Sequence, residues 1–180
     1  MRREPFSIRA ARPQDAEALA AMHVAAWRET YTGLLPARML SNLSVESRAE
    51  AWRRIMARGK TETIVRLVEC DDRVVAFGSC GPQRDEALAK RGFDGEISAI
   101  YVLRACQRLG LGRWITQDLS SRLMAGGCRA VSLWVLRENT GARAFYERLG
   151  GVVVGERVDE RPDGILVELA YGWKDLPALL

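Results

Sequence analysis

The fold is decided by the stretch Glu96–Leu123, EISAIYVLRACQRLGLGRWITQDLSSRL. Its first part, Glu96 to Leu103, is rich in apolar and β-branched side chains, which predicts a strand. A helix ending at Gly126-Gly127 is predicted next, because apolar side chains recur with helical spacing at Leu111, Ile115, Leu119 and Leu123. Two glycines separate the strand from the helix, so the centre of the chain reads as strand, glycine turn and helix.

This glycine turn, Gln107–Gly112, has the composition of an anion site. The first N–H groups of a helix have no partner within the helix, and the helix dipole adds positive potential there. Glycine at 110 and 112 would let an anion such as a pyrophosphate approach the backbone, and Gln107, Arg108 and Arg113 could add hydrogen bonds or charge. Two glycines before a helix are equally typical of a plain tight turn. The Gly-Lys-Ser/Thr ending of a P-loop is missing, and the spacing is not that of a dinucleotide fingerprint.

The remaining elements alternate around this centre. Strands are predicted at Phe6–Ala11, Thr63–Glu69, Val74–Cys80, Ala130–Val135, Val152–Val158 and Ile165–Tyr171. Helices are predicted from Pro13 to about Thr30, over Pro36–Arg58 with a break near Ser41–Ser44, and over Asn139–Leu149. Asp71-Asp72-Arg73 suits a hairpin turn, and the polar segment Gln83–Gly95 is expected to be a loop.

The resulting order is β-α-α-β-β-β-α-β-α-β-β. It predicts an α/β (α+β mixed) fold with a central mixed sheet of about seven strands and helices on both faces. The length of 180 residues fits one domain, residues 1–180, with an adequate core.

Composition excludes several classes of protein. Apolar residues make up 48% and charged residues 28% of the chain, the balance of an ordinary globular protein. The net charge of +4 is spread along the chain, so no nucleic-acid partner is expected. No apolar run approaches the ~18 residues that span a bilayer, and no signal peptide is visible at the start. Four cysteines without metal-ligand spacing indicate reduced thiols, no metal and a cytoplasmic location.

Two motifs carry a resemblance to a known family. Residues 96–102 followed by Gln107-Arg108-Leu109-Gly110-Leu111-Gly112 resemble the coenzyme A motif of the GCN5-related N-acetyltransferases (GNAT), in which Gln/Arg-x-x-Gly-x-Gly/Ala begins the central helix. Residues 139–150, NTGARAFYERLG, resemble the family's second motif. The predicted element order is also the family's, so the resemblance covers nearly the whole chain. Departures are Arg104, where many members have proline, and Gly151, where an aromatic often follows the glycine.

The resemblance implies acetyl-CoA as co-substrate and an amine as acetyl acceptor. It implies that the backbone of Tyr101, Val102 and Leu103 pairs with the pantetheine arm, and that a bulge there splays the strand and aims an N–H at the thioester oxygen. It places the pyrophosphate on Gln107, Arg108, Leu109, Gly110, Leu111, Gly112 and Arg113. Asn139 is expected to cap the last helix and, by resemblance, to bond the coenzyme arm.

Two side chains are candidates for the proton transfers. Tyr146 matches the family's tyrosine and would protonate the departing thiolate; by helical spacing alone it is a core aromatic. Glu96 would accept the amine's proton through water, or is a solvated carboxylate at a strand end. Strand alternation predicts Glu96, Ser98, Ile100 and Val102 on one face.

The acceptor site is expected near the connection between the first two helices. Trp27, Glu29, Tyr31 and Leu34 lie in a segment that resembles an acceptor-site wall in many relatives, although helix anchoring explains Trp27 and Leu34 equally well. His23, the only histidine, is expected to be packed or at the surface rather than catalytic.

Two readings of function follow. The first is an acetyl-CoA-dependent N-acetyltransferase that modifies a primary amine of a small molecule or peptide. The second is a noncatalytic acyl-CoA sensor with the same fold, which the presence of Glu96 and Tyr146 disfavours. The sequence specifies neither the acceptor nor the oligomeric state, although a homodimer is possible.

Overall fold

The computed structural model describes residues 5–57, 63–161 and 164–180. The first four residues, in which no signal peptide is expected, and residue 58, the predicted end of the second helical region, lie outside these ranges. Within them, no helix has the length and apolar character needed to cross a bilayer.

Seven strands of the described chain form one sheet in the order β1-β2-β3-β4-β5-β7-β6. Only β4 and β5 are parallel, and all the other neighbouring strands are antiparallel. The predicted mixed sheet of about seven strands is thereby confirmed. The strands are β1 (Phe6–Ala10), β2 (Ile64–Cys70), β3 (Arg73–Pro82), β4 (Gly95–Val102), β5 (Val131–Leu136), β6 (Val152–Arg161) and β7 (Gly164–Trp173).

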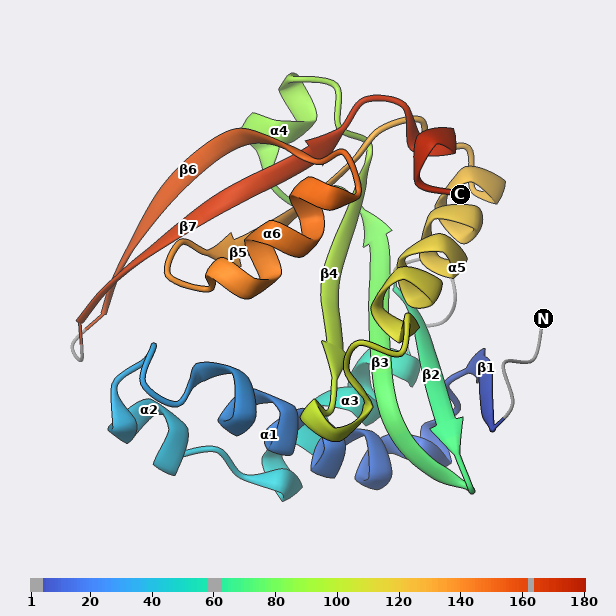
Figure 1. The fold of residues 1–180 in the computed structure, drawn as a ribbon, viewed down its shortest axis with the longest axis vertical. Helices are drawn as coiled ribbons and strands as arrows, with labels where there is room; N and C mark the ends of the chain where they lie inside the picture. The colour runs from blue at the N-terminus through green and yellow to red at the C-terminus, as the bar shows by residue number, and fades with distance from the viewer. Residues whose placement is uncertain (1–4, 58–62, 162–163) are drawn as a thin grey trace.

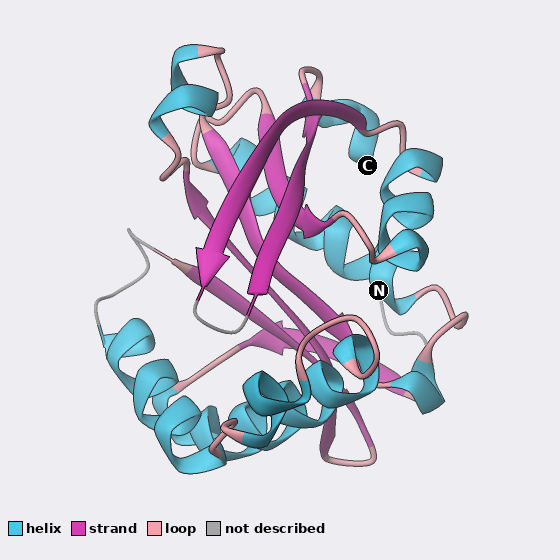
Figure 2. Ribbon diagram, turned by 90° about the vertical axis from the view of Figure 1, so that its left-hand side faces the viewer, coloured by secondary structure: helices cyan, strands magenta, loops and turns pink. Residues whose placement is uncertain are grey.

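Helices cover both faces of the sheet, as predicted (Figure 1). One face packs against α1 and α3, whose buried side chains meet Val65, Leu67 and Phe77 of the sheet. The other face packs against α5 and α6 (Figure 2). The helices are α1 (Ala16–Tyr31), α2 (Ala37–Ser41), α3 (Val45–Ala57), α4 (Glu86–Lys90), α5 (Leu111–Ala125) and α6 (Thr140–Arg148).

The hairpin between β2 and β3 shows how local sequence sets the register. Cys70 pairs with Arg73, so the loop holds only Asp71 and Asp72. Both aspartates have positive φ, 48° and 60°. Two-residue hairpin loops with positive φ at both positions match the twist of the strands, and aspartate tolerates this conformation better than most side chains. The predicted turn is confirmed.

The segment Gln83–Gly95 was expected to be a loop, and this expectation is wrong in its middle. Helix α4 begins after Asp85, whose side chain accepts a hydrogen bond from the N–H of Leu88 at 3.0 Å. Leu88 is buried against Phe93, Ala130 and Ala170. An aspartate cap followed by Glu-Ala-Leu-Ala-Lys is a helix signal in the sequence, and the polar character of the segment obscured it.

Helix α5 lies unusually close to β3. An added Cβ at Gly78 would stand 2.5 Å from Cγ2 of Ile115 and 2.8 Å from Cδ1 of Leu119. Both side chains are fully buried, so neither has free space into which to move. Glycine at position 78 thus brings α5, and the glycine turn at its start, against the sheet.

We predict opposite effects of alanine at two glycines. Gly78→Ala should lower the free energy of unfolding by about 1–3 kcal/mol, because the methyl group overpacks the contact with Ile115. Gly141→Ala in α6 should raise it by up to about 1 kcal/mol, because an added Cβ there meets only the Asn139 side chain, at 3.9 Å. Urea denaturation measures both values. Equal shifts of the same sign would contradict the close packing inferred for Gly78.

Candidate active site

The site is built where β4 and β5 separate. These strands pair only at Gly95 with Val131 and at Glu96 with Ser132. Beyond that point β4 pairs with β3 alone and β5 with β7 alone. A gap with two unpaired strand edges therefore opens in the middle of the sheet.

A bulge in β4 accompanies the separation. Ser79 pairs with Ala99 and Cys80 with Ile97, which leaves Ser98 as an extra residue. The bulge was expected at Tyr101 to Leu103, so its predicted position is wrong by three residues. An extra residue bends the strand and increases its local twist, which turns β4 away from β5.

The bulge also overturns the predicted face of Glu96. Ile100 and Val102 pack against the cluster on the α5 side of the sheet, whereas Ala99 and Tyr101 pack on the side of α1 and α3. Because Ser98 interrupts the alternation, Glu96 lines the same cavity as Tyr101 and not the one lined by Ile100.

The backbone that faces the gap comes from Ile100 and Val102. Leu103 donates its N–H to the carbonyl of Val75 at 3.0 Å, so Leu103 and, two residues earlier, Tyr101 turn their backbone groups toward β3. Ile100 and Val102 turn theirs toward the gap. In agreement, the Val102 carbonyl accepts a hydrogen bond from Nε2 of Gln107 at 3.1 Å. Of the three residues predicted to pair with a pantetheine arm, only Val102 has this orientation.

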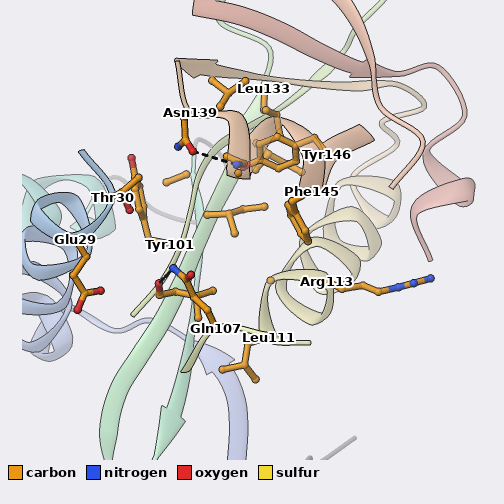
Figure 3. Close-up of a pocket in the computed structure, with 18 of the residues that line it drawn as sticks. Glu29, Thr30, Tyr101, Gln107, Leu111, Arg113, Leu133, Asn139, Phe145 and Tyr146 are labelled. Carbon is orange, nitrogen blue, oxygen red and sulfur yellow. Dashed lines mark hydrogen bonds between the residues drawn. The ribbon is translucent and has the colours of Figure 1, made fainter. Parts of the chain in front are cut away.

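A cavity of about 810 Å³ fills the gap and extends to the glycine turn (Figure 3). It joins most of the residues predicted to bind the coenzyme and two of those predicted for the acceptor. Four arginines and one glutamate line it, so its charge favours an anionic ligand. The predicted residues that line it are Glu29, Tyr31, Tyr101, Val102, Gln107, Arg108, Gly110, Leu111, Gly112, Arg113, Asn139 and Tyr146.

The glycine turn presents the start of α5 to this cavity. The first backbone bond of the helix runs from Trp114 to the carbonyl of Gly110 at 3.0 Å. The N–H groups of Leu111, Gly112 and Arg113 precede it and donate to no other described residue. Such a row of free donors at a helix start binds anions.

The two glycines serve different purposes. Gly110 has a φ of 80°, a left-handed conformation that allows the chain to turn into the helix. Gly112 allows close packing, because an added Cβ would approach the Phe145 ring to 3.3 Å and the ring would have to shift slightly. This packing requirement is additional to the predicted approach of a phosphate to both glycines, which remains a prediction.

The other residues of the turn differ in their surroundings. Leu109 does not line the cavity and is 52% exposed, whereas Leu111 is buried in the core. Gln107 holds the Val102 carbonyl, and the side chain of Arg113 extends away from the centre of the cavity (Figure 3). The free backbone N–H groups of the turn thus face the cavity, which Gln107, Arg108 and Arg113 also line.

Asn139 and Tyr146 stand on α6 at the other wall. The Asn139 side chain accepts a hydrogen bond from the N–H of Ala142 at 3.1 Å, so its predicted capping role is confirmed. Tyr146 is buried among Phe145, Tyr171 and Trp173. Its hydroxyl hydrogen-bonds to no described residue. The pKa of Tyr146 is raised, mainly by burial and to a smaller extent by the nearby Tyr31. Tyr146 is therefore both a core aromatic and a protonated hydroxyl at the cavity.

Two tyrosines meet at the floor of the cavity. The hydroxyls of Tyr31 and Tyr101 lie 3.1 Å apart. Burial raises the pKa of both, so both are neutral. Only a backbone role was expected for Tyr101, because the partner of its side chain lies 70 residues away and leaves no local signal in the sequence.

Glu29 and Leu34 lie at the connection that follows. Glu29 accepts a hydrogen bond from the N–H of Arg104 at 2.7 Å, and its carbonyl accepts one from the Arg104 guanidinium at 2.5 Å. Glu29 therefore ties α1 to the segment that leads into the glycine turn. Leu34 is 36% exposed and lines neither cavity, so the structure does not bring it to the site.

A second cavity of about 600 Å³ lies on the α1 and α3 side and shares Ser98, Ala99 and Tyr101 with the first. Trp27 and Glu96 line it. Glu96 is 7% exposed and forms a two-point ion pair with Arg84, Nη2 to Oε1 at 2.5 Å and Nε to Oε2 at 2.9 Å. Glu96 is thus not a solvated strand end, and its arginine partner was not foreseen.

His23 belongs to the wall of this second cavity. Its Nδ1 accepts a hydrogen bond from Nε1 of Trp52 at 3.2 Å, and its ring contacts Phe77 and Tyr101. Burial, with a smaller contribution from Arg48, lowers its pKa to about 3. The histidine is packed and neutral, as expected. Among the described residues, no three His, Cys, Asp or Glu side chains gather as metal ligands.

Comparison with known proteins agrees with this geometry. Residues 20–151 match the acetyltransferase (GNAT) family. The chain is 31% identical over 175 residues to the uncharacterized N-acetyltransferase YuaI of Bacillus subtilis, covering 96% of this chain and 95% of that protein.

Solved structures share the fold. The PaiA N-acetyltransferase of Thermoplasma acidophilum, in complex with coenzyme A, superposes with a TM-score of 0.72 at 17% identity, covering 91% of this chain and 97% of that one. The yncA protein of Salmonella typhimurium, with its cofactor acetyl-CoA, has a TM-score of 0.68 at 17% identity, covering 95% and 94%.

The buried histidine makes stability depend on pH. Below pH 6.5 the unfolded chain binds a proton at His23 that the folded chain does not, so the free energy of unfolding falls as the pH falls from 6.5 toward 3. At pH 5 the expected loss is about 2 kcal/mol. In His23→Asn, whose amide oxygen can still accept from Trp52, this loss should vanish. Urea denaturation at pH 7 and pH 5 compares the two proteins, and parallel losses in both would exclude His23 as the titrating group.

Proposed function

The chain belongs to the acetyltransferase (GNAT) family, and from this we propose that it transfers the acetyl group of acetyl-CoA to a primary amine of a small molecule or peptide by direct attack on the thioester. Family membership makes it an N-acetyltransferase with an amine acceptor.

The first cavity carries this proposal. It runs from the free N–H groups at the start of α5 to the gap between β4 and β5. The helix start and the arginines of the lining can bind phosphates. An extended pantetheine arm can form hydrogen bonds with the backbone donors and acceptors of an unpaired strand edge. The PaiA and yncA structures, which hold coenzyme A and acetyl-CoA, support the same ligand here.

The reaction requires three events at the gap. The neutral amine attacks the thioester carbon and forms the C–N bond, the C–S bond breaks, and the amine proton leaves while the thiolate gains one. The backbone N–H groups of Ile100 and Val102 point into the gap, where one of them would stabilise the oxyanion that develops on the thioester oxygen. Ile100 thereby joins the residues identified from the sequence.

Tyr146 is proposed as the acid that protonates the thiolate. It lines the first cavity, and its raised pKa keeps the hydroxyl protonated at neutral pH. The hydroxyl hydrogen-bonds to no described residue, so it is available to the leaving sulfur. Desolvation favours the neutral tyrosine and so makes it a weaker acid. The same desolvation makes a buried thiolate a stronger base than a thiolate in water, and this allows the proton transfer.

Glu96 is proposed as the base that accepts the amine proton through water. It lines the second cavity beside Ser98, at the junction with the first. Its ion pair with Arg84 fixes the carboxylate, and the arginine side chain is largely exposed. A carboxylate held at the junction can accept a proton from an amine that approaches on the α1 and α3 side.

Removing the Tyr146 hydroxyl should slow turnover without loss of coenzyme. We expect Tyr146→Phe to lower kcat by about 100-fold or more, the usual effect of losing a general acid, while the Kd for acetyl-CoA in calorimetry stays within twofold. Tyr171→Phe is the matched control, because its hydroxyl bonds Glu147 and lines neither cavity. An unchanged kcat in Tyr146→Phe would remove this tyrosine from the mechanism.

Replacing the Glu96 carboxylate should change how the rate depends on pH. Glu96→Gln keeps a hydrogen-bond acceptor for Arg84 but cannot take a proton, so kcat at neutral pH should fall by about 100-fold and the pH–rate profile should change shape. Glu86→Gln on α4, whose side chain is exposed, is the control. If the Glu96→Gln profile coincides with that of the wild type, another group accepts the proton.

A further inference from the structure

The second cavity indicates the chemistry of the acceptor, provided that acetyl-CoA occupies the first as proposed. The two cavities share Ser98, Ala99 and Tyr101, at the place where the strands part. An amine held in the second cavity would meet the thioester at that junction. The side chains that line the second cavity therefore select the acceptor.

Much of the wall is apolar and aromatic. Trp27 of α1 and Trp52 and Ile55 of α3 line one side, and Tyr101 of β4 lines another. Trp52 packs edge-on against Phe77, and His23 lies between Trp27 and Trp52. Such walls favour an apolar or aromatic group on the ligand, because its transfer from water is favourable there.

The charges of this cavity are unequal. Among the described residues that line it, Arg48, Arg84 and Glu96 carry charged side chains. Arg84 and Glu96 neutralise one another through their two-point ion pair. His23 is neutral, since burial lowers its pKa to about 3. Within residues 5–57, 63–161 and 164–180, no carboxylate pairs with the remaining positive charge, that of Arg48.

Arg48 is placed to receive an anion. It is half-buried, its guanidinium lies 5.7 Å from the centre of the Trp27 ring, and it forms no ion pair with a carboxylate of the described chain. A guanidinium held over an aromatic ring has less freedom and a planar fork of donors that matches a carboxylate. A polyamine would meet net positive charge here.

We propose that the acceptor is an amine that also carries a carboxylate and an apolar group, the chemistry of an apolar amino acid. Arg48 binds the carboxylate, the tryptophans receive the apolar group, and the amine lies toward Glu96 and the junction. Transfer forms the amide C–N bond, breaks the C–S bond and releases free coenzyme A thiol, as in the reaction above.

Matched pairs of acceptors test this. Release of thiol from acetyl-CoA is measured with L-phenylalanine, L-leucine and L-methionine, with their amides, and with spermidine. We expect at least one amino acid to exceed both its amide and spermidine in kcat/KM by about 10-fold, since the amide lacks the charge that Arg48 would bind.

Variants separate Arg48 from a general effect of charge. Arg48→Met should abolish the preference for the carboxylate, mainly through a higher KM for the amino acid and with little change for its amide. Arg54→Met, an exposed position on the same helix outside both cavities, should keep the preference. The preference is the kcat/KM for the amino acid divided by that for its amide. Comparing this ratio between variants cancels the different reactivities of the two amines. Calorimetry of the amino acid with free coenzyme A present gives the same comparison without turnover.

The outcomes distinguish this inference from the proposed function. A higher kcat/KM for the amides or spermidine than for the amino acids would overturn the acceptor class and leave the acetyltransferase assignment intact. So would a loss of the carboxylate preference in Arg54→Met equal to that in Arg48→Met. Thiol release with none of these amines, together with failure of acetyl-CoA to bind, would overturn both. If the protein binds acetyl-CoA but neither binds nor acetylates any of the amino acids, the acceptor class alone is overturned.

Discussion

The site depends on one constraint, the short pairing of β4 with β5. Two residue pairs hold these strands together, and the extra residue Ser98 turns β4 away immediately afterwards. Backbone groups that would complete a ladder in a continuous sheet are left facing a gap. The same bulge exchanges the two faces of β4, so that Glu96 looks into one cavity while Ile100 and Val102 face the other. A single inserted residue thus creates the opening and distributes the chemical groups around it.

The glycine turn is tied to this opening by packing. Gly78 lets α5 approach β3, and Gly112 lets the Phe145 ring of α6 approach the start of α5. The helix start and the helix that carries Tyr146 are therefore held by the same contact, although they belong to different motifs. If the proposed phosphate site and the proposed proton donor lay on separate loops, each would move independently. Here one packing contact positions both, which lowers the ordering that binding requires.

Much of the fold could be predicted from the sequence, because it depends on local patterns of residues. The apolar spacing of Leu111 to Leu123 predicted α5, and Asp71 and Asp72 predicted the hairpin turn, since each depends on neighbouring residues alone. The errors have non-local causes. The bulge at Ser98 follows from the register between β3 and β4, and the ion pair of Glu96 is made with Arg84, which lies on the other side of α4 in the sequence. No spacing in the sequence encodes these contacts.

Burial decides which groups near the gap can change their protonation. Desolvation lowers the pKa of His23 to about 3 and raises the pKa of Tyr31, Tyr101 and Tyr146, so these four side chains are neutral at neutral pH. Glu29, the carboxylate of the first cavity, is hydrogen-bonded to the Arg104 backbone. The carboxylate that remains at the junction is Glu96, on the opposite side from Tyr146. In the proposed reaction a proton leaves the amine on one side of the gap and another reaches the sulfur on the other, and the bulge at Ser98 is what places Glu96 and Tyr146, the proposed base and acid, on those two sides.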